Sequence, residues 1–146
     1  AAALGAILAG APEASVQAMR DYGRDLGIAF QAVDDLLGIW GDPSVTGKPV
    51  GSDLRQHKKT LPVVAAIAAA DGLAGEIVAL LRGRLSDRDV ATAAQFVDRY
   101  GGREAAMETA EQHLAAALEA LNRTPLVPAP AAELAEIASF VVGRDR

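Results

Sequence analysis

Apolar residues recur along most of the chain at steps of three and four, which is the spacing of one helix face. The longest such run covers residues 12–40, and its apolar stripe consists of Val16, Met19, Gly23, Leu26, Phe30, Val33 and Leu37. Strand-like alternation of polar and apolar residues is not sustained. The pattern therefore predicts an all-α fold, built as a helical bundle.

Glycine and proline divide this pattern into elements. We expect helices over residues 1–9, 12–40, 61–70, 73–81, 86–100, 103–121 and 131–142. Ser86 and Asp89 resemble a capping box, and Thr60 before Pro62 suits a helix start. Residues 61–70 are apolar on all sides, which predicts a central, buried helix. Residues 41–53 should form a loop and residues 122–130 a Pro-rich connection. One domain over residues 1–146 is expected.

Composition narrows the classes of function. The formal charge is 14 − 19 = −5, which argues against a nucleic-acid-binding surface because such affinity depends on basic residues. Without cysteine there are no disulfides or thiolate zinc sites. The longest apolar run, residues 61–70, is too short for a membrane span, which needs about 20 residues. We expect a cytoplasmic location, and the start inside an apolar segment without Met suggests that something upstream has been removed.

An acidic pair interrupts the apolar part of the long helix. Successive helix residues lie about 100° apart, so Asp34 and Asp35 share one flank with Gly27, Gln31 and Gly38. Mg²⁺ is usually held by one or two carboxylates together with substrate phosphates. The pair therefore suits a Mg²⁺–diphosphate site, although a half-exposed surface pair of acids gives the same sequence.

Basic residues follow the acidic pair. Lys48 lies between Gly47 and Gly51, which let the backbone approach a ligand, and Lys58 begins a second basic site. Lysine commonly binds phosphate. The Walker A pattern does not fit, because Pro49 stands where that motif needs Ser or Thr. A solvated surface lysine is the alternative for each position taken alone.

The segments FQAVDD, TGKPVGSDL and KKTLP, in that order, resemble the trans-isoprenyl diphosphate synthases of the polyprenyl synthetase family. The final residues, FVVGRDR, are also similar to the tail of that family. The resemblance covers the whole chain and maps it onto the C-terminal half of the family. It implies the C-terminal part of the isoprenoid synthase fold, without the N-terminal half that carries the first Asp-rich motif.

The resemblance also implies residue roles. Asp34 would bind Mg²⁺, and Asp35 would belong to the same network of metal and lysines. Lys48 and Lys58 are implied as contacts to the allylic diphosphate. Phe30 and Gln31 would line the reaction centre, with Gln31 also contacting the substrate. Thr60 would serve either the site or only as a helix cap.

The sequence departs from the family pattern at Gly38, where many members have a third Asp. Asp42, one helical turn further on, is a candidate to replace that carboxylate as a metal ligand. The larger departure is the missing first Asp-rich motif, together with the basic residues that hold isopentenyl diphosphate.

The implied reaction is the Mg²⁺-dependent condensation of an allylic prenyl diphosphate with isopentenyl diphosphate. With one of two acidic motifs, this chain is expected to be inactive alone, and to form a homo-oligomer or associate with the missing half. A non-catalytic helical partner subunit is the alternative. A terpene cyclase ranks third, because its Asn/Ser/Glu metal motif is not evident.

Overall fold

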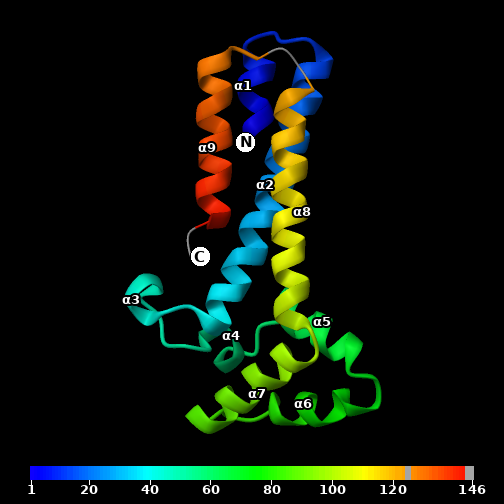
Figure 1. The fold of residues 1–146 in the computed structure, drawn as a ribbon, viewed down its shortest axis with the longest axis vertical. Helices are drawn as coiled ribbons and strands as arrows, with labels where there is room; N and C mark the ends of the chain where they lie inside the picture. The colour runs from blue at the N-terminus through cyan, green and yellow to red at the C-terminus, as the bar shows by residue number, and fades with distance from the viewer. Residues whose placement is uncertain (124–125, 144–146) are drawn as a thin grey trace. The chain divides into compact units, whose positions relative to one another are not determined.

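The computed structural model describes residues 1–123 and 126–143, and over these residues it is helical without strands. The all-α prediction is confirmed. Seven helices exceed one turn among the described residues (Figure 1): α1 Ala2–Leu8, α2 Glu13–Trp40, α5 Leu61–Ala69, α6 Ala74–Leu80, α7 Asp87–Arg99, α8 Gly102–Asn122 and α9 Pro128–Gly143. Residues 144–146 of the predicted family tail lie outside the described residues.

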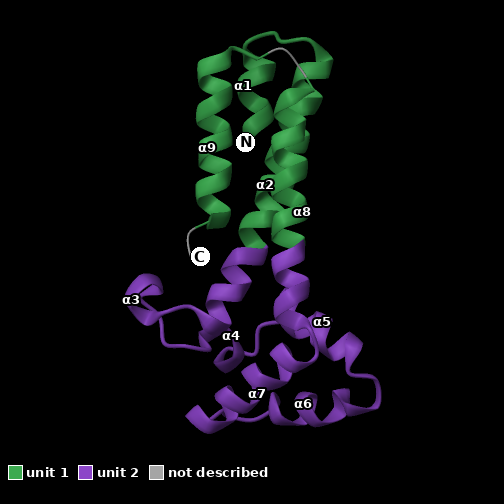
Figure 2. Cartoon of the chain, in the orientation of Figure 1, with its two compact units in different colours: residues 1–31, 109–146 green, residues 32–108 purple. Residues whose placement is uncertain are grey.

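The contacts within the chain define two compact units (Figure 2). Unit 1 contains residues 1–31 and 109–146, and unit 2 contains residues 32–108. The long helices α2 and α8 each contribute residues to both units. The expected single domain over residues 1–146 stays a prediction.

Unit 1 is held by an apolar core between α1, α2, α8 and α9. Its fully buried members are Tyr22, Ala117, Ala120, Leu121 and Ala138. The Tyr22 hydroxyl donates a hydrogen bond of 2.9 Å to the Leu134 carbonyl, which joins α2 to α9. Tyrosine in a core normally finds such a partner, because its apolar ring carries a polar tip.

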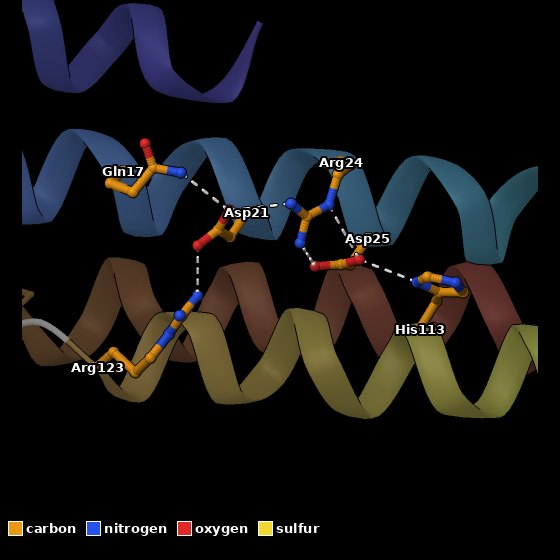
Figure 3. Close-up of polar contacts among 6 residues, drawn as sticks. All are labelled: Gln17, Asp21, Arg24, Asp25, His113 and Arg123. Atoms are coloured by element: carbon orange, nitrogen blue, oxygen red, sulfur yellow. Dashed lines mark hydrogen bonds and ion pairs between the residues drawn. The ribbon is translucent and has the colours of Figure 1, made fainter.

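A cluster of charged side chains also joins α2 to α8 in unit 1 (Figure 3). Asp21 accepts from Arg123 at 2.7 Å, and Asp25 lies 2.9 Å from the Nδ1 atom of His113. Arg24 bridges the two acids. The sequence does not reveal this cluster, because the paired residues are 88 and 102 positions apart on two helices and match no local motif.

The predicted apolar stripe of α2 is only partly correct. Val16 and Val33 are buried, but Phe30 is 41% exposed. The buried side of α2 is instead centred on small residues, namely Ala18, Ala29 and Ala32. Phe30 lies about 100° around the helix from Ala29 and so falls outside that buried face.

Unit 2 has its own core, which α5, α6 and α7 form together with the end of α2. Buried members of this core are Ile39, Leu54, Val63, Ala66, Ile77, Val90, Ala93 and Val97. Helix α7 begins with the predicted capping box, in which Ser86 and Asp89 bind each other's backbone N–H groups. That prediction is confirmed.

The expected burial of residues 61–70 on all sides is wrong. Helix α5 buries Pro62, Val63 and Ala66, while Val64 is 50% exposed. Helix α5 packs on α6 and α7, but Val64, Ala68 and Ala69 remain exposed.

The expected loop over residues 41–53 contains two short helices, α3 Pro43–Thr46 and α4 Ser52–Arg55. A short 3₁₀ turn, η1 Asp71–Leu73, separates α5 from α6. Pro128 begins α9 three residues earlier than expected, because proline is tolerated in a first helical turn.

Among the described residues, no helix by itself combines the length and apolar character needed to cross a membrane. Two consecutive segments, Leu61–Ala69 and Asp71–Leu80, together have the required length and apolar composition, but they are bent by 119° relative to each other.

Candidate functional site

The two neighbouring acids of α2, both in unit 2, have different surroundings. Asp35 is 8% exposed, and its Oδ2 atom accepts a hydrogen bond of 2.8 Å from the Leu61 N–H at the start of α5. Asp34 is half-buried, and its carboxylate makes no hydrogen bond or ion pair within residues 1–123 and 126–143. Asp35 therefore anchors α5, whereas the Asp34 oxygens are available to a ligand.

Thr60 precedes α5 at the expected position, but the prediction that its side chain caps this helix is wrong. Pro62 offers no N–H, and the N–H of Leu61 already donates to Asp35. The Thr60 Oγ1 atom is buried and has no hydrogen-bond partner among the described residues. Buried hydroxyl groups normally have a partner, so the Thr60 hydroxyl is an exception in this structure.

Lys58 lies close to the acidic side chains. Its Nζ atom is 2.6 Å from Oδ1 of Asp53, whose side chain is buried. The pKa of Lys58 is raised above its usual value, mainly by the hydrogen bond to Asp53 and further by the negative charges of Asp53, Asp34 and Asp35. The structure thus brings Lys58 into the electrostatic field of the predicted acidic pair.

Lys48 does not join this cluster. It is exposed after α3, and the Lys48 N–H donates to Thr46 Oγ1 at 3.3 Å. Gly47 ends α3 with a left-handed backbone (φ 67°), a conformation that glycine adopts without strain. The Lys48 ammonium makes no ion pair in the described part of the chain. Its predicted contact to a diphosphate stays a prediction.

Asp53 occupies the space beside Gly38. A Cβ atom on Gly38 would collide with the carboxylate carbon and Oδ2 of Asp53. Ser52 lies at the same place, where its hydroxyl donates to the Gly38 carbonyl at 3.4 Å. Where the family pattern has a third acidic side chain on this helix, the present chain therefore has a carboxylate that reaches in from α4.

The other predicted site residues are Phe30, Gln31 and Asp42. Phe30 and Gln31 are exposed on the part of α2 that belongs to unit 1. Helix α2 ends at Trp40, so Asp42 does not extend its acidic flank. Instead, Asp42 Oδ1 accepts from the N–H and the hydroxyl of Ser44, both at 2.7 Å, and these bonds lower its pKa. The predicted roles of Phe30, Gln31 and Asp42 stay predictions.

The carboxylates suit Mg²⁺ only if other oxygen ligands complete the site. No group of three or more His, Cys, Asp or Glu side chains is arranged to hold a metal ion in the described part of the chain. Mg²⁺ usually takes one or two carboxylates and completes its shell with waters and phosphate oxygens. The accessible Asp34 fits that kind of binding, in which metal and diphosphate are held together.

The comparisons with known proteins decide the family. The family model described as polyprenyl synthetase matches residues 1–100. The chain belongs to the polyprenyl synthetase family. It is 43% identical to (2E,6E)-farnesyl diphosphate synthase of Mycobacterium tuberculosis, over 98% of this chain and 41% of that enzyme. It is 47% identical to geranylgeranyl diphosphate synthase of the same organism, over 82% of this chain and 35% of that enzyme.

Solved structures of polyprenyl synthetases share the fold. The Streptomyces coelicolor polyprenyl synthetase matches with a TM-score of 0.89 and 40% identity, covering 96% of this chain and 44% of that one. A Corynebacterium glutamicum geranylgeranyl pyrophosphate synthase, complexed with isoprenyl diphosphate and magnesium, matches with a TM-score of 0.86 and 33% identity. That match covers 97% of this chain and 41% of the other. The chain thus spans less than half the length of these relatives.

Two residues near the acidic pair have surroundings that the sequence does not predict. Asp53 belongs to the family pattern, but the sequence does not show that its buried carboxylate pairs with Lys58, and Thr60 is expected either at the site or as a helix cap. Gly38 is the sequence feature that indicates the place of the Asp53 side chain, because a glycine within a helix leaves room for a neighbouring group. No local signal distinguishes a capping threonine from one whose hydroxyl is left unpaired.

Proposed function

We propose that this chain binds the Mg²⁺ complex of an allylic diphosphate, and that it supplies the second acidic motif of a prenyltransferase. The longer protein would condense that diphosphate with isopentenyl diphosphate to give a longer prenyl diphosphate. The observation that carries this proposal is the 2.6 Å ion pair of the Lys58 ammonium with Asp53, with the negative charges of Asp34 and Asp35 acting on the same ammonium. Relatives named farnesyl and geranylgeranyl diphosphate synthases support it.

The proposed chemistry is the departure of diphosphate from an allylic carbon. The bond between C1 and oxygen breaks, and its electron pair leaves with the diphosphate. The alkene of isopentenyl diphosphate then forms the new carbon–carbon bond, and loss of a proton restores a double bond. Groups that stabilise the charge developing on the leaving group contribute most to such catalysis.

The residues of this chain would divide the work of binding. Asp34 would hold Mg²⁺, which neutralises phosphate oxygens when bound. Lys58 would donate N–H groups to the phosphate oxygens. Asp35 would keep α5, and with it Thr60, attached to the acidic end of α2.

Calorimetric titration of the 146-residue chain with geranyl S-thiolodiphosphate, a poorly reactive allylic diphosphate, tests this proposal. We expect binding that requires MgCl₂ and is lost on chelation with EDTA. Asp34→Asn should weaken it about tenfold or more, which corresponds to at least about 1.4 kcal/mol. The exposed Asp98→Asn on α7 is the control and should bind normally.

We expect the chain alone to bind without turnover, because the relatives are more than twice its length. Binding that is indifferent to Mg²⁺ and to Asp34→Asn would contradict the proposal. A chain that binds but remains inactive when joined to the unmatched part of the S. coelicolor relative would favour the partner-subunit alternative.

A further inference from the structure

Lys58 follows α4 through a Schellman-type turn in unit 2. Gln56 is the C-cap of α4, and His57 adopts the left-handed conformation with φ 54°. The Lys58 N–H donates to the Asp53 carbonyl, and the His57 N–H donates to the Leu54 carbonyl, both at 3.0 Å. This pair of bonds is the pattern that defines the motif.

The turn has an ionic contact where such turns commonly have an apolar one. An apolar contact frequently joins the third residue from the helix end to the second residue beyond the cap. Those positions are Asp53 and Lys58 here, and their side chains form the 2.6 Å ion pair. Asp53 therefore binds Lys58 twice, through its backbone carbonyl and through its carboxylate.

Gly38 makes this arrangement possible. Asp53 is 3% exposed, and its carboxylate lies where any Cβ on Gly38 would be. Its Oδ1 atom has a further contact of 3.5 Å from the Ser52 hydroxyl. An alanine at position 38 would therefore displace Asp53 from Lys58.

We propose that Asp53 is a positioning residue, which fixes the Lys58 ammonium for binding a diphosphate, and that in this chain Gly38 leaves the space that the Asp53 carboxylate occupies. The proposal rests on the proposed function of Lys58 as a diphosphate contact. An ammonium group has three N–H donors, so Lys58 retains two for phosphate oxygens while one donates to Asp53.

The direction in which Asp53→Asn changes the affinity for an anion separates a positioning role from simple charge repulsion. A carboxylate near an anion-binding site repels the anion, so Asp53→Asn would tighten anion binding if charge were its only influence. If Asp53 instead orients Lys58, the same substitution weakens binding. Asparagine keeps the volume beside Gly38 and removes the charge of the ion pair.

Titration of the 146-residue chain with sodium pyrophosphate in MgCl₂ provides the measurement. We expect Asp53→Asn to weaken binding about tenfold, and Asp87→Asn to leave it unchanged. Asp87 is the matched control, because it forms an ion pair of 2.7 Å with Arg55 of the same α4 helix and is exposed. Unchanged or tighter binding by Asp53→Asn would overturn the proposal.

A double-mutant cycle excludes direct metal binding by Asp53. In a Lys58→Met background, a positioning residue has nothing left to position, so Asp53→Asn should cause no further weakening. Further weakening of about tenfold in that background would instead assign Asp53 to the metal and overturn the positioning role.

Nitrogen-15 NMR of labelled lysine ammonium groups tests, without any ligand, whether Asp53 holds the Lys58 ammonium. We expect a slowly exchanging Lys58 signal that is absent from Lys58→Arg and is lost in Asp53→Asn and Gly38→Ala. Gly75→Ala should retain it, because a Cβ at that helical glycine meets nothing within 4 Å. Circular dichroism should show that each variant is folded.

The binding and NMR experiments distinguish failure of the proposed function from failure of the positioning role of Asp53. If the wild-type chain does not bind Mg²⁺-pyrophosphate, the proposed function fails, while the NMR signal still reports whether Asp53 holds Lys58. If the Lys58 signal persists in Asp53→Asn, the positioning role fails whatever the binding experiment shows.

Discussion

At the scale of single residues, the contrast between Asp34 and Asp35 shows how adjacent, identical side chains acquire different properties. The rotation of about 100° between successive helix residues directs Asp35 to the Leu61 N–H and leaves Asp34 without a protein partner among the described residues. The sequence predicts that both acids share a flank, since helical angles are fixed. It does not predict that α5 begins against one of them, because that depends on tertiary packing.

Thr60 provides a prediction at this scale. Its buried, unpaired hydroxyl destabilises the folded chain, because desolvation is not offset by a hydrogen bond. Thr60→Val removes the hydroxyl at nearly constant volume and should raise the free energy of unfolding by about 1 kcal/mol. Urea unfolding measures the effect.

Thr92→Val is the control for this substitution. The Thr92 hydroxyl is exposed and already donates to the Arg88 carbonyl at 2.9 Å, so its replacement should give no comparable gain in stability. Equal stability changes at both threonines would show that the Thr60 hydroxyl carries no desolvation penalty.

At the scale of elements, most helices were predictable because their limits depend on local chemistry. Proline, glycine and the Ser86–Asp89 box act within one turn, so α2, α6 and α7 appear within a few residues of their expected limits. The burial of α5 was not predictable. Its uniformly apolar sequence carries no periodicity to indicate which face meets α6 and α7.

The junction between α2 and α5 leads to a prediction about stability. Asp35→Ala leaves the half-buried Leu61 N–H without its acceptor and should lower the free energy of unfolding by about 1 kcal/mol or more. Asp34→Ala changes a side chain without a partner among the described residues and should stay within about 0.5 kcal/mol. Urea unfolding of the two variants measures the difference, and equal losses would contradict the assigned anchor.

The charged cluster between α2 and α8 predicts the acid sensitivity of unit 1. The pKa of Asp21 is lowered mainly by the hydrogen bond from Arg123, and that of Asp25 mainly by the hydrogen bond from Arg24. A carboxylate with a lowered folded-state pKa stabilises the fold above its unfolded pKa, about 3.9. That stabilising contribution is lost as the pH falls from the unfolded-state pKa through the lower pKa of the folded state.

Unit 1 should therefore lose stability as the pH falls below about 4. Arg123→Met removes the main cause of the Asp21 shift and should make this loss less steep. Arg20→Met is the control, because Arg20 pairs with the exposed Glu13 at 3.4 Å, outside the cluster. Hydrogen exchange of α8 amides between pH 5 and 3 measures the slope, and identical slopes for Arg123→Met and the wild type would contradict the argument.

At the scale of the whole chain, several large apolar side chains are exposed on unit 1. Leu4 and Leu8 lie one turn apart on α1, and Ile137 and Phe140 lie one turn apart on α9. Leu8 and Phe140 are 86% and 71% exposed. The relatives are more than twice as long as this chain, so the chain studied alone lacks most of what a full-length family member contains.

Exposed apolar surface of this kind drives association in water, because burying it removes it from solvent. We therefore expect the 146-residue chain to self-associate, with a mass by light scattering that rises with concentration. Leu8→Glu combined with Phe140→Glu should shift it toward the monomer, since charges replace the two most exposed of these four side chains. Val45→Glu is the control, because Val45 is equally exposed but lies on α3 in unit 2. A monodisperse wild-type monomer would show that these side chains do not form a contact surface.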